Sequence, residues 1–194
     1  MHMRGRAVVR RALFLSLVTL ATVMVVVSPA NARRNDTGGS TSGEHCIVQV
    51  VDQRSDGELV TGESACFGTF AEAMSFASAG EVELALDTPG SVVFTDEPIG
   101  TLAAEFTLGI HFDGANGTGS SIGILGTSCS GGYWNALGFW ANRISSSFNG
   151  CYHLRHYDKP SRVGSYFNTY GGGQVDNIAS WFDNRTESVA YYAS

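Results

Sequence analysis

The chain has 194 residues, of which 43% are hydrophobic and 15% charged, so it is neither a disordered polyampholyte nor a polytopic membrane protein. Its 24 glycines and 11% aromatic content favour an all-β fold over a helical bundle. The formal net charge is −6, although Arg4, Arg6, Arg10 and Arg11 all lie at the extreme N-terminus. The rest of the chain is therefore more acidic still, which argues against a nucleic-acid or anionic-membrane partner.

The segment 1–32 has the features of a secretory signal peptide. Its arginines precede an apolar run over 12–27, which is short for a membrane core of ~30 Å, and an A-x-A pattern follows at Ala30-Asn31-Ala32. An uncleaved membrane anchor is the alternative. Cleavage would make Arg33 the first residue of a secreted protein that has no further membrane association.

The cysteine count fits export, because all four cysteines lie beyond the predicted signal peptide. An even number of cysteines in an exported chain favours disulfides, with three possible connectivities. We favour Cys46–Cys66 and Cys129–Cys151, which join neighbours within each apparent structural unit. A zinc site is the alternative, but no C-x2-C or H-x3-H spacing supports it.

The mature chain is predicted to begin with a flexible leader over 33–44, which is polar and rich in glycine. A small α+β unit is expected over 45–100, with its boundary near Pro98-Ile99-Gly100. Strands are predicted over 46–51, after an Asp56-Gly57 turn, over 81–86, where hydrophobic and polar residues alternate, and over 91–94.

One helix is predicted inside this unit, over 70–79. Thr69 and Glu72 have the spacing of a capping box, in which each residue bonds the backbone of the other. Phe70 and Met74 belong to one apolar face, and Gly80 closes the helix. We expect this unit to pack against the following domain, because its strands and helix expose apolar faces. No function is predicted for it.

From residue 106 onward the sequence repeats itself. His111-Phe112-Asp113 recurs as His156-Tyr157-Asp158, and Gly119-Ser120 recurs as Gly164-Ser165. Trp140-Ala141-Asn142-Arg143 aligns with Phe182-Asp183-Asn184-Arg185 further along. A duplication of this kind implies two supersecondary units that bury a common face. Short strands, many glycines and no convincing helix predict four-stranded Greek keys that pair as a β-sandwich over 101–194.

This part of the chain resembles the βγ-crystallin family, including its secreted microbial members. Each family motif opens with an aromatic residue and a glycine at the spacing seen from Phe112 to Gly119 and from Tyr157 to Gly164. A second signature consists of two Asn/Asp residues, two variable residues, then Ser/Thr-Ser. The corresponding loops here are 141–146 and 183–188. The resemblance implies a mainly β, two-motif Greek-key fold and a non-enzymatic protein.

The resemblance also implies calcium sites, each using groups from both loops. The residues carried over are Asn142, the Arg143 carbonyl, Ser145, Asp183, Asn184, the Arg185 carbonyl and Glu187. Calcium takes six to eight hard oxygen ligands, which such groups supply. Ala141 and Glu187 depart from the motif, one removing an oxygen and the other adding a charge. We expect an affinity of ~10⁻⁴ to 10⁻³ M, and the alternative is that the loops are turns without a metal.

The sequence therefore predicts a secreted, monomeric, βγ-crystallin-like protein with a structural or protective role and weak calcium binding. The alternative function is a secreted proteinase inhibitor or a killer-toxin-like protein of the same fold, with a protease as partner. A third possibility is adhesion to cell-wall glycans through exposed aromatic residues such as Trp134, Trp140 and Trp181, although the repeat favours core packing for Trp140.

Two further patterns suggest catalysis and are interpreted as structural. The segment 119–123 matches G-x-S-x-G, but a nucleophile elbow requires a strand-turn-helix context that this β segment does not offer. His111 and His156 occupy equivalent repeat positions, so we expect both to make structural hydrogen bonds. His153 and His156 should lie on opposite faces of a strand, which argues against shared metal ligation.

Overall fold

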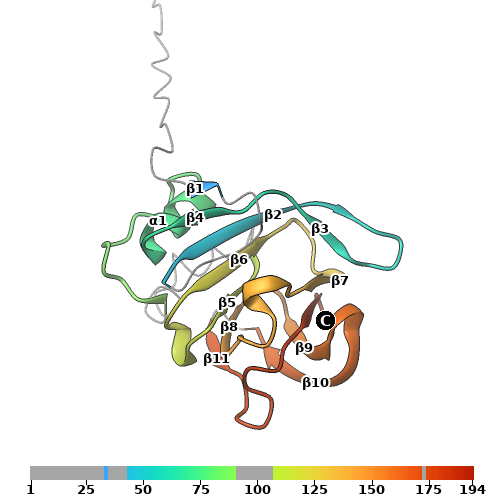
Figure 1. The fold of residues 1–194 in the computed structure, drawn as a ribbon. Helices are drawn as coiled ribbons and strands as arrows, with labels where there is room; N and C mark the ends of the chain where they lie inside the picture. Colours follow the sequence, from blue (N-terminus) through green and yellow to red (C-terminus); the bar gives the residue numbers. More distant parts are fainter. Residues whose placement is uncertain (1–32, 35–42, 91–106, 172–173) are drawn as a thin grey trace, which may run out of the picture. The chain divides into compact units, whose positions relative to one another are not determined.

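A computed structural model describes residues 33–34, 43–90, 107–171 and 174–194 of the chain (Figure 1). The predicted signal peptide, most of the leader, the predicted strand 91–94 and the boundary near residue 100 lie outside these ranges. Within the described ranges, no helix combines the length and apolar character needed to cross a membrane.

The described chain is mainly β, with two sheets and one α-helix, as the sequence predicts. The helix is α1 (Phe70–Ala77), and short 3-10 turns are η1 (Ala115–Gly117), η2 (Gly138–Trp140) and η3 (Pro160–Arg162). The strands are β1 (Arg33–Arg34), β2 (His45–Gln53), β3 (Leu59–Thr61), β4 (Ala65–Phe67), β5 (Thr107–Phe112), β6 (Ser121–Leu125), β7 (Ser130–Asn135), β8 (Ser146–Asn149), β9 (His153–Lys159), β10 (Val163–Tyr170), β11 (Val175–Asn177) and β12 (Ser188–Tyr192).

The two sequence repeats have the same strand topology. Strands β5 to β8 form the first repeat and β9 to β12 the second. One sheet contains the order β6-β5-β8-β11, and the other has the order β10-β9-β12-β7. Each sheet therefore combines the first, second and fourth strands of one repeat with the third strand of the other. This exchange makes the two Greek keys one folding unit, because neither repeat completes a sheet by itself.

The hydrogen-bond register is repeated as well as the order. Phe112 pairs with Ser121 in one half, and the equivalent Tyr157 pairs with Tyr166 in the other. The exchanged strands also match, since β11 pairs with β8 and β7 pairs with β12 at equivalent positions. The duplicated Greek-key sandwich predicted from the sequence is thus confirmed in topology.

The turn between the first two strands of each repeat has the same backbone conformation. Asn116 and Ser161 have φ angles of 56° and 57°, which is the left-handed region that most side chains avoid. An aspartate at or next to the end of the preceding strand closes this turn: Asp113 accepts from the Ser120 amide at 2.7 Å, and Asp158 accepts from the Ser165 amide at 2.8 Å. The repeated His-aromatic-Asp sequence therefore encodes a carboxylate that holds the folded hairpin.

The segment 45–90 extends the first sheet instead of forming a sheet of its own. Strand β2 runs parallel to β6, and β4 and β1 continue the sheet beyond it. Because β1 pairs with β4, the predicted leader is wrong for its first two residues, which form a strand. Helix α1 lies beside β2 and β4 in Figure 1 and packs Phe70 and Met74 against Ile110, Phe112 and Phe148. The central strands of the first sheet, β5, β6 and β8, are consequently buried on both faces.

Helix α1 begins with the predicted capping box. The Thr69 hydroxyl accepts from the Glu72 amide, and the Glu72 carboxylate accepts from the Thr69 amide, both at 3.2 Å. The predicted strand over 81–86 is wrong, because this segment forms no strand. Val82 instead packs beneath the helix with Phe70 and Met74. The alternation seen in the sequence reflects burial against a helix, not a ladder of backbone hydrogen bonds.

Both predicted disulfides are present. Cys46–Cys66 links β2 to β4, and Cys129–Cys151 links the segment before β7 to the segment before β9. No free cysteine occurs in the described chain. Among the described residues, Glu44, Cys46 and Cys66 lie close enough together to be considered as metal ligands. The two cysteine sulfurs are bonded to each other in a disulfide, however, and are not thiolate ligands. Two disulfides indicate that the protein matures in an oxidising environment.

The core between the two sheets contains aromatic residues and two histidines. Trp140 is buried as the repeat predicted, and Trp134 stacks on His111 with ring centroids 5.6 Å apart. His111 bonds the Ser147 and Tyr191 hydroxyls, and His156 bonds the Thr169 hydroxyl. These hydrogen bonds are structural, as expected for repeat-equivalent residues.

Candidate functional site

The two predicted calcium loops lie side by side between the ends of the two sheets. Each loop leads into the last strand of its repeat, so 141–146 precedes β8 and 183–188 precedes β12. Backbone hydrogen bonds join the loops reciprocally: the Asn142 amide donates to the Thr186 carbonyl at 2.9 Å, and the Asn184 amide donates to the Ile144 carbonyl at 3.3 Å. The pairing of the two Greek keys therefore brings the two halves of the predicted site together.

Side chains of the two loops form two composite clusters. The Asn142 side-chain amide donates to Glu187 at 2.8 Å, so the first cluster uses one residue from each loop. In the second, the Ser145 hydroxyl donates to the Asn184 side-chain oxygen at 3.4 Å, and the Asn184 side-chain amide donates to Asp183 at 3.2 Å. Each cluster thus contains one carboxylate. Glu187 supplies the negative charge that Ala141 does not provide.

The second residue of each loop has a conformational role. Asn142 and Asn184 have φ angles of 57° and 55°, in the left-handed region where asparagine is among the best-tolerated residues. Their backbone requirement explains the asparagines whether or not a metal binds. Support for metal binding must therefore come from the remaining oxygen atoms of the loops.

Asp183 carries such an oxygen. Its Oδ1 is buried and has no hydrogen-bond partner among the described residues, although Asn184 donates to Oδ2. Within the described chain, no backbone amide donates to the carbonyls of Arg143 or Arg185. A buried carboxylate oxygen without a donor is costly, and a bound cation would remove that cost. The donor set of the second cluster therefore fits a hard cation such as calcium.

The first cluster fits a cation less well. Nδ2 of Asn142, which carries hydrogens, faces the Glu187 carboxylate and satisfies it. Ala141 has no side-chain oxygen to add. A cation between Asn142 and Glu187 would require the Asn142 amide to turn so that its oxygen replaces its nitrogen, and one between Asn184 and Asp183 Oδ2 would require the same of Asn184. The clusters differ because, among the described residues, only the second has a buried carboxylate oxygen without a donor, Oδ1 of Asp183.

Two acidic residues beside the loops were not predicted from the sequence. Asp113 pairs with Arg143 at 3.3 Å, and Asp158 pairs with Arg185 at 2.9 Å, again at equivalent positions. These pairs fix the third residue of each loop against the folded hairpin of the same repeat. The recurring His-aromatic-Asp sequence was the signal that could have identified both aspartates.

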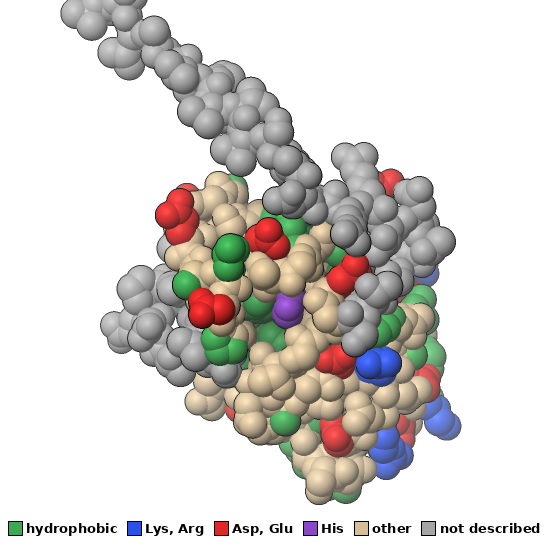
Figure 2. Space-filling view, turned by 60° about the vertical axis from the view of Figure 1, so that its left-hand side comes forward, with side chains coloured by type: hydrophobic (Ala, Val, Ile, Leu, Met, Phe, Trp, Pro, Cys, Tyr) green, Lys and Arg blue, Asp and Glu red, His purple; other side chains and the backbone are tan. Residues whose placement is uncertain are grey.

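The positive charges of Arg143 and Arg185 are each paired with an aspartate, so they repel a cation bound in the loops less than unpaired charges would. In the face drawn in Figure 2, acidic side chains are dispersed among uncharged atoms, while Lys and Arg gather toward one side and lie next to acidic groups. The local ion pairs leave the loop oxygens as the polar groups available to a cation.

The remaining sequence patterns are structural or exposed. Ser120 of the G-x-S-x-G match is buried, and its hydroxyl accepts from the Gly43 amide, so it is not placed as a nucleophile. His153 lies on the opposite face of β9 from His156, where it stacks on Tyr192 at 4.6 Å. Trp181 is 58% exposed, unlike Trp134 and Trp140.

Comparison with known proteins yields a structural likeness. No family model matches the chain, and no curated protein matches it. Among solved structures, the chain is similar to a tryptophan-to-aspartate mutant of a βγ-crystallin domain from Clostridium beijerinckii, at 11% identity and a TM-score of 0.36. The match covers 45% of this chain and 99% of that chain. The assignment of the fold here rests on the strand order and the repeated turns.

Proposed function

We propose that this is a secreted, non-enzymatic, βγ-crystallin-like protein that binds calcium weakly at the second loop cluster. The observation that carries the proposal is the buried Oδ1 of Asp183, which no described group satisfies. Asp183, Asn184 and Ser145 would hold the ion. The carbonyls of Arg143 and Arg185, to which no backbone amide of the described ranges donates, would be further ligands. Calcium would provide a positively charged partner for the Oδ1 atom of Asp183, which has no hydrogen-bond partner among the described residues.

The expected effect of calcium is stabilisation of the fold. An ion held only by the folded state raises the free energy of unfolding by about 1.4 kcal/mol at ten times the dissociation constant. The ion would also couple the two Greek keys, because Ser145 belongs to one repeat and Asp183 and Asn184 belong to the other. Such a function is structural and agrees with a protein already stabilised by two disulfides.

The first testable prediction is that calcium raises the melting temperature of the metal-stripped protein, with a midpoint at ~10⁻⁴ to 10⁻³ M. Asp183→Ala removes the unsatisfied carboxylate, so the calcium response should disappear. Glu187→Gln should retain the response, because Glu187 belongs to the other cluster. Thermal unfolding followed by circular dichroism, with and without calcium, measures both effects.

Asp52→Asn is the matched control, since Asp52 is an exposed carboxylate on β2 that belongs to neither cluster. A wild-type melting curve that is unchanged up to ~10 mM calcium would contradict the proposal. A response lost in Glu187→Gln but kept in Asp183→Ala would place the ion in the first cluster. The alternatives of a proteinase inhibitor, a killer-toxin-like protein or a cell-wall binder remain predictions of the sequence.

A further inference from the structure

The outer face of the second sheet, which lies opposite to the sandwich core, is rich in tyrosine. Helix α1 covers the first sheet, whereas this face exposes large side chains. The strand registers place one set of alternate residues on it. That set includes Arg155 and Tyr157 of β9, Tyr166 and Tyr170 of β10, Tyr192 of β12 and Tyr133 of β7.

The charge of this face is opposite to that of the whole protein. The chain has a formal net charge of −6, yet the acidic residue of the four strands is Asp158 alone. Asp158 alternates with Arg155 along β9, and its carboxylate pairs with Arg185. Unlike Arg54, Arg143 and Arg185, Arg155 forms no ion pair within the described ranges. The face therefore complements a negatively charged group.

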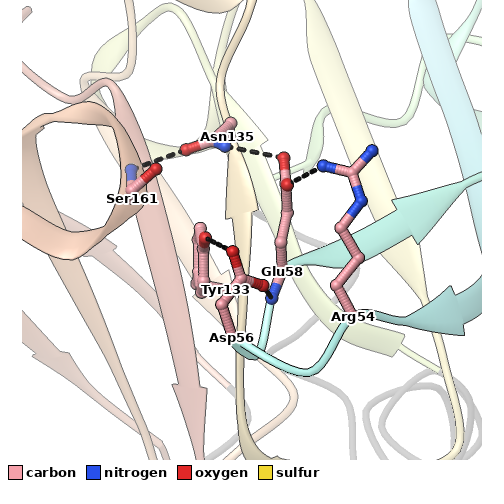
Figure 3. A network of polar contacts seen from close by, with 6 residues as sticks. All are labelled: Arg54, Asp56, Glu58, Tyr133, Asn135 and Ser161. Carbon is pink, nitrogen blue, oxygen red and sulfur yellow. Dashed lines mark hydrogen bonds and ion pairs between the residues drawn. The ribbon is translucent and has the colours of Figure 1, made fainter.

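The β7 end of this face already binds a turn of the protein itself. The turn of the β2–β3 hairpin lies against β7, where the Tyr133 amide donates to the Gly57 carbonyl at 2.9 Å. The Tyr133 hydroxyl donates to the Asp56 carboxylate at 3.3 Å (Figure 3). Cζ of Arg162 lies 4.7 Å from the centroid of the Tyr133 ring, and the guanidinium donates to the Asp56 carbonyl at 2.8 Å. An arginine above a tyrosine thus binds an aspartate-bearing turn.

Further polar contacts hold this turn at the β7 end (Figure 3). Glu58 pairs with Arg54 and accepts from the Asn135 side-chain amide at 2.7 Å, and Asn135 in turn accepts from the Ser161 amide at 2.8 Å. The hairpin that is fixed in this way bounds a cavity of about 600 Å³ beneath it. Because its turn is bound to β7, the hairpin does not cover the opposite end of the face, at β10.

The β10 end has the same pair of residue types. Cζ of Arg155 lies 4.4 Å from the Tyr166 ring centroid and 5.4 Å from that of Tyr192. Its Nε donates to the Asn168 side chain at 3.0 Å, and its guanidinium also bonds the Tyr157 side chain. A guanidinium has five N–H donors, so donors remain for a ligand. Tyr166 is 50% exposed, so no described segment covers this end as the hairpin turn covers the other.

We propose that the β10 end of this face docks an acidic turn of a partner protein, as the β7 end docks the turn that contains Asp56. The Arg155 guanidinium binds the carboxylate of the partner's turn, and Tyr166 and Tyr170 pack against its backbone. Tyrosine and arginine are among the residue types that most often dominate the energetics of protein interfaces. This surface is distinct from the calcium loops, and the proposal goes beyond the proposed function.

The probe is an acetylated and amidated octapeptide of alternating aspartate and serine, added to the oxidised mature protein without calcium. We expect saturable binding with a dissociation constant of ~1 mM or tighter. The same peptide with asparagine in place of aspartate should bind at least ~tenfold more weakly. In NMR spectra the Arg155 Nε–H resonance should shift, while that of Arg185, already paired with Asp158, should not. Absence of saturable binding of the acidic peptide at millimolar concentrations would overturn the proposal.

Two variants locate the peptide. Arg155→Gln removes the charge and should weaken binding by at least ~tenfold. Arg54→Gln is the matched control, because it makes the same change in net charge at an exposed arginine that already pairs with Glu58. It should bind the peptide as wild type does. Circular dichroism establishes that each variant is folded. Wild-type affinity in folded Arg155→Gln, or an equal loss in both variants, would refute the site.

Tyr166→Ala tests the aromatic part of the surface and should weaken binding of the acidic peptide several-fold. An uncharged oligosaccharide, chitohexaose, tests the other chemistry that an exposed tyrosine surface could serve. We expect no saturable binding of chitohexaose. If chitohexaose binds, loses affinity in Tyr166→Ala and keeps it in Arg155→Gln, while the acidic peptide does not bind, the surface recognises glycans and the proposal is wrong.

Discussion

The free energy of unfolding should fall steeply as the pH is lowered from about 6.5, because two histidines are buried in uncharged form. Burial lowers the pKa of His156 to about 3. Burial also lowers the pKa of His111 well below its ordinary value of 6.5, and a protonated His156 beside it would lower the pKa further. Both rings lie in the sandwich core, with centroids 5.8 Å apart.

The sign follows from proton binding. Between pH 6.5 and the folded-state pKa of each histidine, the unfolded chain binds a proton that the folded protein does not. The contribution of the two neutral histidines to the free energy of unfolding is therefore fully present above about pH 6.5. It is lost as the pH falls, by about 1.4 kcal/mol per pH unit for each histidine. Two such residues would remove about 4 kcal/mol over one and a half pH units, a large share of the stability of an ordinary domain.

His156→Leu isolates one contribution. Its ring makes a single hydrogen bond, to Thr169, whereas His111 makes two. Urea unfolding between about pH 6 and pH 5 should show a slope that is lower by about 1.4 kcal/mol per pH unit than in the wild type. His153→Leu is the control, because His153 lies on the outer face of the sheet and its slope change should be smaller. A slope unaffected by His156→Leu would mean that His156 is not buried in neutral form.

Replacing Gly119 by alanine should destabilise the protein by about 2.5 to 5 kcal/mol. Gly119 has a φ of +77°, and a Cβ there would lie 2.1 Å from Asp113 Oδ1. The left-handed backbone costs an alanine roughly 1 to 2 kcal/mol, and displacing the carboxylate from the Ser120 amide costs about 1.5 to 3 kcal/mol more. Gly164→Ala should behave alike, since its Cβ would lie 2.0 Å from Asp158 Oδ1.

Gly138→Ala separates the two contributions. Gly138 has a φ of +60°, but a Cβ there would meet no atom within 4 Å, so only the backbone cost of roughly 1 to 2 kcal/mol should appear. In an Asp113→Ala background the clash is absent, and the cost of Gly119→Ala should fall to the Gly138→Ala value. Denaturant unfolding of the wild type, of each single variant and of the double variant measures these costs. An undiminished cost in that background would show that the carboxylate is not the cause.

Gly119 and Gly164 belong to the repeated turns from which the duplicated Greek-key fold was predicted. The folded hairpin is a local structure, in which an aromatic residue, an aspartate and a glycine close a turn within a few residues of one another. Local constraints of this kind appear directly in the sequence, and their recurrence reveals the duplication. Helix α1 was predictable for the same reason, because its capping box joins residues three positions apart.

The candidate site was predictable only in part. The loop residues were recognised from the motif, but their partners were not, since Asn142 meets Glu187 and Ser145 meets Asn184 across the two repeats. In the sequence, Ala141 and Glu187 were two unrelated departures from the calcium-binding motif, one in each loop. The structure brings their two loops together, so that Glu187 provides a carboxylate beside Asn142.

The sequence by itself determined the repeats, the helix and its cap, since each depends on spacing along the chain. Among three possible disulfide connectivities it favoured the one that the structure contains. Only the tertiary structure decided the exchange of third strands, the pairing of β2 with β6 and the cavity under the β2–β3 hairpin. It also decided that 81–86 packs beneath a helix instead of forming a strand. These features depend on which apolar faces find one another in the folded chain, and no local pattern encodes that choice.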